Sequence, residues 1–374
     1  MAMKMQRLGA AGPKVSTIGL GCMGMSGVYG QTNEAESAAT IHAALDAGIN
    51  LIDTGDFYGM GDNEMLIGRA LKGRRDEALL SVKFGALRAP DGRWIGHETR
   101  PAYVKTWLAY SLKRLAVEAI DIYRPARLDP AVPIEDTVGA IAEMVKAGYV
   151  RWIGLSELGP ETIRRAAKVH PIVDLQIEYS LVSRGPEAKI FPALRELGIA
   201  ATAYGVLSRG LLTRSKPGVG DYRAHMPRFM EQNRGRNEEL VAKLERLAAA
   251  RGMTPAQMAL AWVKSKQDFV VPVVGARTRA QLAECLAAVE TRLSADEMNA
   301  LEEAVPAAAV AGTRYGKIRC RRWTAKNELR QARGIAPPAG MRRRPPGRLS
   351  CGPHSPRPSR TLGKETPKWI AWRF

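Results

Sequence analysis

Short apolar segments alternate along the chain with longer stretches in which apolar residues recur at helical spacing. The short segments have the length and the bounding turn residues of buried β-strands. Eight segments fit this description, at residues 15–21, 50–54, 78–84, 120–128, 150–157, 173–179, 199–207 and 269–276. The alternation predicts a series of consecutive strand and helix units.

Start signals place helices between the predicted strands. Asn33, with Glu36 three residues later, resembles a capping box that begins a helix over residues 34–47. Thr254 and Gln257 form a second such box, with proline at the first helical position. Further helical patterns cover residues 100–115, 134–148, 160–169 and 187–198.

This order of elements predicts an α/β fold. Strands that alternate with helices of this length are typical of βαβ units with parallel pairing. Eight such units favour closure into a (β/α)8 TIM barrel, which we expect to span residues 1–316 of the 374. Barrels of this kind carry their chemistry on the loops that follow the strands.

Residues 317–374 differ in composition from the rest of the chain. They contain 16 Lys and Arg against two acids, so that only +5 of the chain's +19 net charge falls on residues 1–316. The segment is rich in Arg, Pro, Gly and Ser without an apolar period, which predicts disorder. Three interpretations stay open: a nucleic-acid-binding arm, a solvated extension, and a shifted reading frame in a GC-rich gene. We favour the third and do not expect nucleic acid as the partner.

Cysteine usage and hydropathy bear on metals, membranes and compartment. Cys22, Cys285, Cys320 and Cys351 lack the paired spacing of a disulfide framework or zinc site, so we expect no metal and a reducing environment. No run approaches the roughly 20 apolar residues of a membrane span. We therefore interpret the protein as cytoplasmic.

The segment GLGCMG, residues 19–24, matches the dinucleotide fingerprint G-x-G-x-x-G. That fingerprint functions only when a helix begins at once, so that its amino end faces the pyrophosphate. Here MSGVYGQT intervenes before a helix can begin at Asn33. We therefore reject a Rossmann fold and expect a flexible loop above the first strand, whose backbone approaches a ligand.

Three chemically reactive side chains fall at the catalytic end of the predicted barrel. Asp53 ends the strand of 50–54, Tyr58 follows it, and Lys83 lies near the end of the next strand. A lysine beside a phenol lowers the pKa of the tyrosine, and an aspartate keeps that lysine charged. The set predicts an acid that protonates an alkoxide.

Five segments, two of which contain these residues, closely resemble the aldo-keto reductases over roughly residues 5–316. NLIDTGDFYG (50–59) is similar to the family signature D-T-A-x-x-Y-G, and SVKFG (81–85) to its lysine strand. IGLSE, LQIEYSLVSR and VVGARTRAQLAE resemble its fifth strand, its Q-x-E/P-Y segment and its cofactor loop. The resemblance implies NADPH-dependent reduction of aldehydes or reactive ketones to alcohols, with Tyr58 as the proton donor.

The resemblance also implies which residues bind NADPH/NADP+. Ser156 and Gln176 would hold the nicotinamide carboxamide, and Tyr204 would stack on the ring. Arg277, with Arg279 near it, would pair with the 2′-phosphate, because a guanidinium matches phosphate with two parallel hydrogen bonds. The remaining positions, beside the first two strands and along the pyrophosphate and adenosine, are Gly21, Cys22, Met23, Asp53, Ser208, Gly210, Leu212, Gly275, Gln281 and Glu284.

The chain departs from the family pattern at Ala126. The family has a catalytic histidine in segments resembling D-L-Y-x-x-H-R, whereas this chain reads DIYRPARLD (121–129), with alanine in place of the histidine. Two residues are candidate substitutes for the histidine: Arg124, which shares strand parity with Ala126, and His97, in the loop after the third strand. His225 is a weaker candidate, and the alternative is that nothing replaces the histidine. Cys285 likewise stands where the family has an asparagine that meets the adenine.

Two functions stay open on this basis. The first is a working reductase of a small-molecule carbonyl substrate. The second is an NADPH-binding regulatory or sensor barrel with little or no turnover. Tyr29, Phe57, Met60 and Trp94 would line the mouth, which favours aromatic carbonyl compounds.

Overall fold

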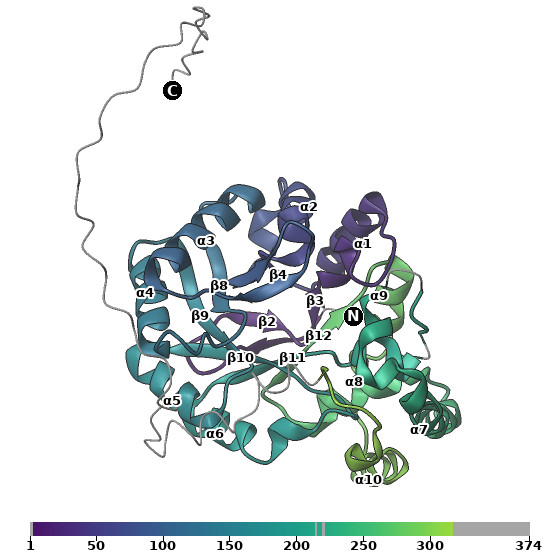
Figure 1. Cartoon of the computed structure of the whole chain (residues 1–374). Helices are drawn as coiled ribbons and strands as arrows, with labels where there is room; N and C mark the ends of the chain where they lie inside the picture. The colour runs from purple at the N-terminus through teal and green to yellow at the C-terminus, as the bar shows by residue number, and fades with distance from the viewer. Residues whose placement is uncertain (1–2, 214, 219–220, 317–374) are drawn as a thin grey trace, which may run out of the picture. The chain divides into compact units, whose positions relative to one another are not determined.

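The computed structural model describes residues 3–213, 215–218 and 221–316. Eight parallel strands close into a barrel in the order β10-β11-β12-β3-β4-β5-β8-β9, seen end-on in Figure 1. The strands are β3 (Gly19–Gly21), β4 (Leu51–Gly55), β5 (Leu79–Phe84), β8 (Ile120–Pro125), β9 (Val150–Ser156), β10 (Ile172–Glu178), β11 (Ala200–Tyr204) and β12 (Val270–Gly275). The predicted TIM barrel is confirmed.

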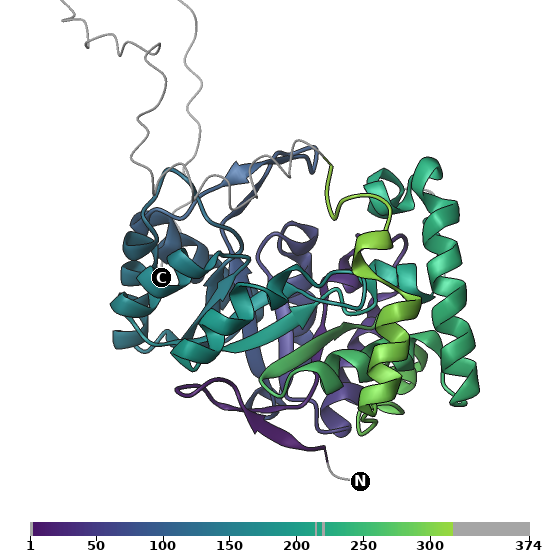
Figure 2. The same ribbon diagram turned by 90° about the horizontal axis from the view of Figure 1, so that it is seen from below.

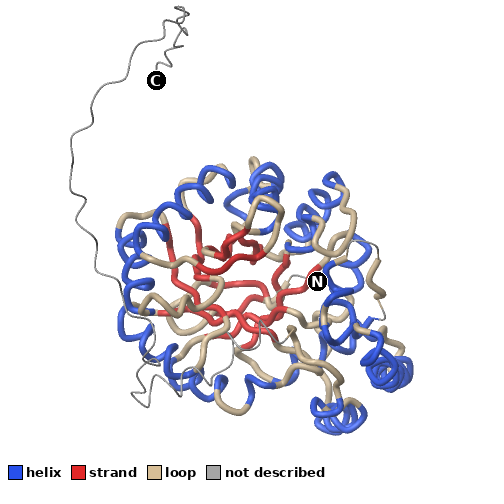
Figure 3. Tube along the Cα trace, viewed as in Figure 1, coloured by secondary structure: helices blue, strands red, loops and turns tan. Residues whose placement is uncertain are grey.

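Helices surround the strands, as Figure 3 shows by colour. They are α1 (Glu34–Asp46), α2 (Asp62–Ala70), α3 (Pro101–Leu115), α4 (Ile134–Lys146), α5 (Pro160–Val169), α6 (Ile190–Leu197), α7 (Glu231–Ala250), α8 (Pro255–Lys266), α9 (Arg279–Leu286) and α10 (Ala295–Ala304). The main core packs their apolar faces against the outer side of the barrel strands.

Both predicted start signals are present in the structure. The Asn33 side chain accepts a hydrogen bond from the Glu36 amide, although the Glu36 carboxylate binds Arg279 and does not close the box. The Thr254 and Gln257 box is complete in both directions. Local sequence therefore fixes where α1 and α8 begin.

Three predicted strands have bounds that differ from the structure by more than one residue at an end. The segment 15–21 divides between β2 (Lys14–Ser16), which pairs with β1 (Met5–Arg7) in a hairpin, and the short barrel strand β3. The segment 120–128 ends as a strand at Pro125, and 199–207 ends at Tyr204. Strands therefore end earlier than the apolar pattern, which continues into buried loops.

The two ends of the barrel are covered differently, as Figure 2 shows. The β1–β2 hairpin lies at one end. A second hairpin, β6 (Ala86–Arg88) with β7 (Trp94–His97), lies at the other end, near the chain that leads to residue 316. This second end is where the barrel strands have their carboxyl termini, because β6 directly follows β5.

The expectation of a disordered tail over 317–374 lies outside the described residues. Among the helices that are described, none has the length and apolar character needed to cross a membrane.

Candidate active site

The Asp53 carboxylate lies at the centre of a buried hydrogen-bond network. Lys83 Nζ donates to its Oδ1 at 2.7 Å, while Ser81 Oγ and Gln176 Nε2 donate to its Oδ2 at 3.0 and 2.7 Å. Ser81 and Lys83 share one face of β5 because side chains alternate along a strand. Asp53 and Lys83 are 4% and 3% exposed, so the pair is sheltered from water.

Tyr58 follows this network at the start of a short 3-10 turn, η2 (Tyr58–Gly61). The Lys83 ammonium lies 5.0 Å from the centroid of the tyrosine ring, so Asp53, Tyr58 and Lys83 come together as predicted. Gly59 has φ of 56°, and a Cβ there would lie 2.9 Å from Ser26 Cβ. Glycine therefore lets the turn pass close to the neighbouring loop.

The pKa of Tyr58 shifts in the direction opposite to the lowering expected from the sequence. Burial, followed by the nearby Asp53 charge, raises the pKa of the Tyr58 phenol well above its ordinary value. Burial also lowers the pKa of Lys83, against the opposing effect of Asp53. Burial therefore dominates and the Asp53 charge adds to it, so that the phenol holds its proton firmly.

Three residues assigned to the nicotinamide lie side by side on neighbouring strands. Ser156 is level with Gln176 across the β9–β10 pair, and Tyr204 ends the adjacent β11. The Tyr204 hydroxyl donates to Glu157 Oε1 at 2.7 Å. The ends of β9, β10 and β11 therefore form one continuous rim beside Asp53.

The loop after β11 has the features of an anion-binding turn. Ser208, Arg209 and Gly210 all have positive φ, of 49°, 58° and 89°. Arg228 Nη1 donates to Ser208 Oγ at 3.2 Å, while its buried Nε has no hydrogen-bond partner among the described atoms. An unsatisfied buried guanidinium N–H beside a left-handed turn fits the pyrophosphate of a dinucleotide. Leu212, in contrast, is fully buried in the core.

The adenosine end of the predicted cofactor site lies between the β3 and β12 loops. Gly21 and Gly275 are level with each other across the strand pair. Arg277 Nη1 donates to the Tyr29 carbonyl at 2.9 Å, and its amide donates to the Gln281 side chain. The Arg277 guanidinium therefore spans the two loops at the place predicted for the phosphate.

Other residues predicted to bind the cofactor in this region already make contacts within the protein. The Cys22 side chain is fully buried, its amide donates to the Asp53 carbonyl, and its own carbonyl accepts from Asn63. Met23 follows it in a 3-10 turn. The Glu284 carbonyl accepts a hydrogen bond from the Gln257 side chain.

Arg279 is less available to bind the 2′-phosphate than the sequence suggested. Its guanidinium forms an ion pair with Glu36 at 2.9 Å on the exposed surface of α1 and α9. The competing carboxylate reduces what this arginine can offer to a phosphate.

The structure decides against Arg124 as the substitute for the missing histidine. Arg124 is fully buried inside the barrel and pairs with Asp174 at 2.7 Å. Gly154 makes room for this pair, since a Cβ there would lie 2.6 Å from Asp174 Oδ1. Ala126, where the family has histidine, is 1% exposed. Arg124 therefore forms an ion pair with Asp174 in the interior of the barrel.

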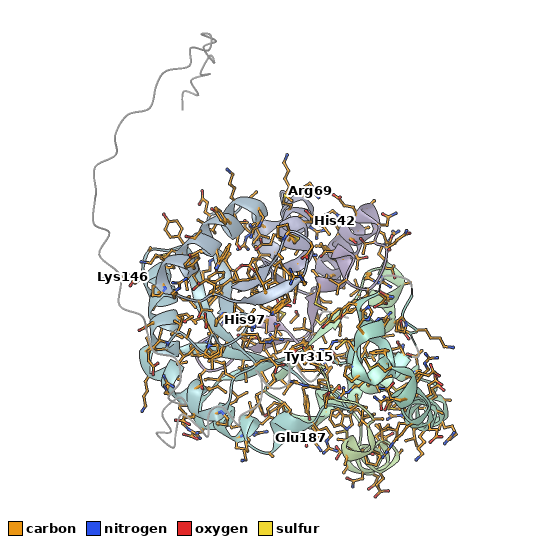
Figure 4. The ribbon with its side chains drawn as sticks, in the orientation of Figure 1. His42, Arg69, His97, Lys146, Glu187 and Tyr315 are labelled. Carbon is orange, nitrogen blue, oxygen red and sulfur yellow. The ribbon has the colours of Figure 1, made fainter. Side chains whose placement is uncertain are left out.

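His97 lies nearer the mouth but packs within a row of aromatic rings. It contacts Trp94 at 5.2 Å, Trp94 contacts Phe57 at 5.7 Å, and Phe57 contacts Tyr58 at 4.7 Å between centroids. Figure 4 labels His97 and Tyr315 over the barrel in end view, whereas His42 and Arg69 lie out among the helices. His225 lies in a separate 3-10 turn, η6 (Tyr222–His225).

Only some of the residues predicted to line the mouth of the site lie together in the structure. Phe57 and Trp94 form one wall beside Tyr58, while Met60 is 56% exposed. Tyr29 lies close enough to Arg223 for a cation–π contact, at 5.3 Å.

Sequence reasoning missed two elements of the mouth. The first is Tyr315, whose hydroxyl lies 3.2 Å from that of Tyr204 and accepts from Arg209 at 2.9 Å. The second is Arg127, which follows Ala126 and donates to Ser156 Oγ at 3.4 Å. The available signal for the second was the family segment D-L-Y-x-x-H-R, whose arginine Arg127 matches.

Among the described residues, no three His, Cys, Asp or Glu side chains are grouped as they would be around a metal ion. Cys22 and Cys285, both buried, are free thiols.

Comparison with known proteins identifies close relatives of this arrangement. The model of the aldo/keto reductase family matches residues 17–306. "Probable aldo-keto reductase 1" of Glycine max is 41% identical over 318 residues, covering 83% of this chain and 91% of the relative. "Aldo-keto reductase yakc [NADP(+)]" of Schizosaccharomyces pombe is 39% identical over 311 residues, covering 80% and 92%.

Solved structures agree. The glycerol dehydrogenase AKR11B4 from Gluconobacter oxydans superposes with a TM-score of 0.73 at 29% identity, covering 81% of this chain and 95% of that one. The holo form of aldo-keto reductase AKR11C1 from Bacillus halodurans gives 0.69 at 30% identity, covering 82% and 97%.

Proposed function

Because this chain belongs to the aldo/keto reductase family and is thus an oxidoreductase, we propose that it reduces aldehydes and reactive ketones with NADPH. The proton comes from Tyr58. The observation that carries the proposal is the grouping of Tyr58, Lys83 and Asp53 at the carboxyl end of the barrel, with the ammonium 5.0 Å from the phenol ring.

The chain's own residues perform the proton half of the reaction. A phenol whose pKa burial raises well above 10 stays protonated at neutral pH, as a proton donor must. The alkoxide that forms at the carbonyl oxygen is more basic still and takes the proton from Tyr58 Oη. Lys83 then lies over the ring to stabilise the phenolate, while Asp53 holds Lys83 in place at 2.7 Å.

Bound NADPH would supply the hydride that the carbonyl carbon receives. Ser156, Gln176 and Tyr204 would hold the nicotinamide end, and the Ser208–Thr213 turn with Arg228 would hold the pyrophosphate. Arg277 supports the choice of the phosphorylated cofactor, as does the NADP(+) in the name of the Schizosaccharomyces pombe relative.

Single-turnover oxidation of bound NADPH by 4-nitrobenzaldehyde tests the proposal. We expect Tyr58→Phe to lower the rate by about 100- to 10,000-fold, the usual contribution of a positioned proton donor. NADPH binding, measured by cofactor fluorescence, should stay within about twofold, since the phenol acts in proton transfer. Tyr110→Phe, an exposed change on α3, is the matched control and should behave as the unmodified protein.

A protein that binds NADPH tightly but fails to oxidise it over minutes with this aldehyde would reject the proposal in favour of a regulatory barrel. Equal rates for Tyr58→Phe and the unmodified protein would reject the role of Tyr58.

A further inference from the structure

A buried ion pair in the interior of the barrel lies directly against the Asp53 network. Arg124 on β8 and Asp174 on β10 are both fully buried and pair at 2.7 Å. Arg124 Nη2 also donates a hydrogen bond to Ser81 Oγ at 2.9 Å, and Ser81 in turn donates to Asp53 Oδ2 at 3.0 Å. A single hydroxyl group therefore joins the ion pair to the carboxylate of the proposed active site.

The chemistry of the guanidinium fixes the direction of this hydrogen-bond chain. A guanidinium has N–H donors and no acceptor, so the Ser81 oxygen must accept from Arg124. A serine hydroxyl has one proton, and the Ser81 proton points to the Asp53 carboxylate. Arg124 thus keeps Ser81 as a donor to Asp53.

The donors around Asp53 decide which of its oxygens meets each neighbour. Ser81 and Gln176 donate to Oδ2 at 3.0 and 2.7 Å, whereas Lys83 donates to Oδ1 at 2.7 Å. The carboxylate cannot rotate without losing hydrogen bonds that water is not there to replace. Lys83 is also level with Arg124 across the β5–β8 pair, and burial, together with the smaller effect of the Arg124 charge, lowers the pKa of Lys83.

The pair of Arg124 with Asp174 is a poor source of stability. Within the part of the chain that the structure describes, the buried Nε of Arg124 and the buried Oδ1 of Asp174 have no hydrogen-bond partner. The cost of removing two charges from water is recovered only when such atoms are satisfied, and apolar residues of similar volume often stabilise a fold as well or better. A role in the site accounts better for a pair that lies on the hydrogen-bond chain to Asp53.

We propose that Arg124 is a positioning residue of the active site, which acts through Ser81 to orient the Asp53 carboxylate. Asp53 in turn holds the Lys83 ammonium beside the Tyr58 ring. The inference rests on the proposed reductase function. Arg124 is enclosed by the barrel, so it does not replace the missing histidine at the substrate, and it keeps its protons throughout the reaction.

Ser81→Ala removes the hydroxyl that joins the ion pair to Asp53. In single-turnover reduction of 4-nitrobenzaldehyde by NADPH, we expect the rate at saturating aldehyde to fall by about 10-fold or more, the value of a hydrogen bond to a charged group. The aldehyde concentration that gives half of the maximal rate should change by less than about threefold, because the hydroxyl orients a carboxylate and does not bind substrate. Ser81→Thr keeps a hydroxyl and should react within about threefold of the unmodified protein.

Thr137→Val is the matched control for the loss of a buried hydroxyl. Thr137 is 2% exposed on α4, and its hydroxyl donates to the Thr99 carbonyl at 3.1 Å, outside the site. The rate of this variant should stay within about twofold of the unmodified protein, since no part of the chain to Asp53 changes.

A double variant separates positioning from folding. Arg124→Met with Asp174→Val replaces the ion pair by apolar side chains and should keep a Tm within about 5 °C of the unmodified protein, measured by circular dichroism. Its rate should nevertheless fall by about 10-fold, because the Ser81 hydroxyl is no longer directed at Asp53. Adding Ser81→Ala to the double variant should lower the rate by less than about threefold more, because both changes break the same chain.

The outcomes that overturn the proposal are distinct from failure of the reductase function. A rate for Ser81→Ala or for the double variant within about threefold of the unmodified protein overturns it, as does an equal loss in Thr137→Val or an undiminished loss when Ser81→Ala is added to the double variant. If the double variant does not fold, Ser81→Ala and its rescue by Ser81→Thr decide alone.

If the unmodified protein does not reduce 4-nitrobenzaldehyde, the reductase function fails, and thermal unfolding then tests the chain by itself. The loss in Tm that Ser81→Ala causes should be at least about halved in the double variant, where the hydroxyl has already lost Arg124. A loss in Tm that stays the same would show that the hydroxyl does not link Arg124 to Asp53.

Discussion

Asp53→Asn tests the buried network at its centre. The change is nearly isosteric but removes the negative charge that Lys83 contacts at 2.7 Å. Ser81 and Gln176 retain an acceptor in the asparagine carbonyl. The variant therefore isolates the consequence of leaving a buried ammonium without its carboxylate.

The expected cost follows from burial. With both partners at or below 4% exposure, removing one charge should lower the free energy of unfolding by about 3 to 5 kcal/mol. For a barrel of this size that corresponds to a fall in Tm of about 6 to 10 °C. The double variant Asp53→Asn with Lys83→Met removes both charges and should regain about half of the loss, or more. NADPH oxidation should stay lost in both variants, because neither positions Tyr58 beside an ammonium.

The stability of Asp53→Asn should also depend on pH. In Asp53→Asn, Lys83 loses the partner that raises its pKa, while burial still lowers it. A lysine whose folded pKa is depressed destabilises the fold below its unfolded pKa, near 10.4, and this cost disappears as pH rises toward that value. The deficit measured by urea unfolding should therefore be smaller at pH 9.5 than at pH 7.

Urea and thermal unfolding, followed by circular dichroism, measure all three proteins. A single variant within about 1 kcal/mol of the unmodified protein would show that the pair is not buried in solution as described. A double variant no more stable than the single one would show that the cost comes from lost packing and not from the unpaired charge.

Three further predictions concern cofactor choice, proton donation and a second buried acid. In titrations of cofactor fluorescence, Arg277→Ala should weaken NADPH binding by about 10- to 100-fold and NADH binding by less than about threefold. Arg279→Ala should change the binding of either cofactor by less than about threefold, because the Arg279 guanidinium already pairs with Glu36. Because burial raises the pKa of Tyr58, the rate of aldehyde reduction should not fall between pH 7 and 9 through loss of its proton, and a decline that Tyr58→Phe abolishes would contradict this. Burial raises the pKa of Asp56 to about 8, which costs stability progressively as pH rises from about 4 to 8. Asp56→Asn should therefore be more stable than the unmodified protein at pH 8, by about 1 to 3 kcal/mol, with a smaller gap at pH 5 in urea unfolding.

The barrel was predictable because its signals are local and repeated. Apolar runs of strand length, helix periodicity between them and caps such as Thr254 each point to the same architecture. The meeting of Asp53 with Lys83 follows once the strands are parallel, since neighbouring strands bring such side chains together at one end. The N-terminal hairpin was missed because β2 and β3 form one continuous apolar segment, in which pairing partners leave no local trace.

The mouth was less predictable because it depends on where strands end. Extending the alternation of β8 beyond Pro125 made Arg124 a candidate for the site. In the structure Arg124 pairs with Asp174 inside the barrel, and Gly154 makes room for it. Tyr315 is brought to Tyr204 by a segment that approaches from the far end of the described chain, a contact that no spacing in the sequence indicates.

The pKa of Tyr58 is raised, not lowered as the sequence predicted, and this bears on how the site works. From residue types alone, Lys83 is expected to act as a free cation that loosens the phenolic proton. In the structure the ammonium is 2.7 Å from the Asp53 carboxylate, and burial, followed by the charge of that carboxylate, raises the pKa of the phenol. Arg127 lowers the pKa of Tyr58, but by less than burial raises it. The phenol therefore keeps its proton because it is buried beside Asp53, and the charge of Lys83 by itself does not decide the pKa of Tyr58.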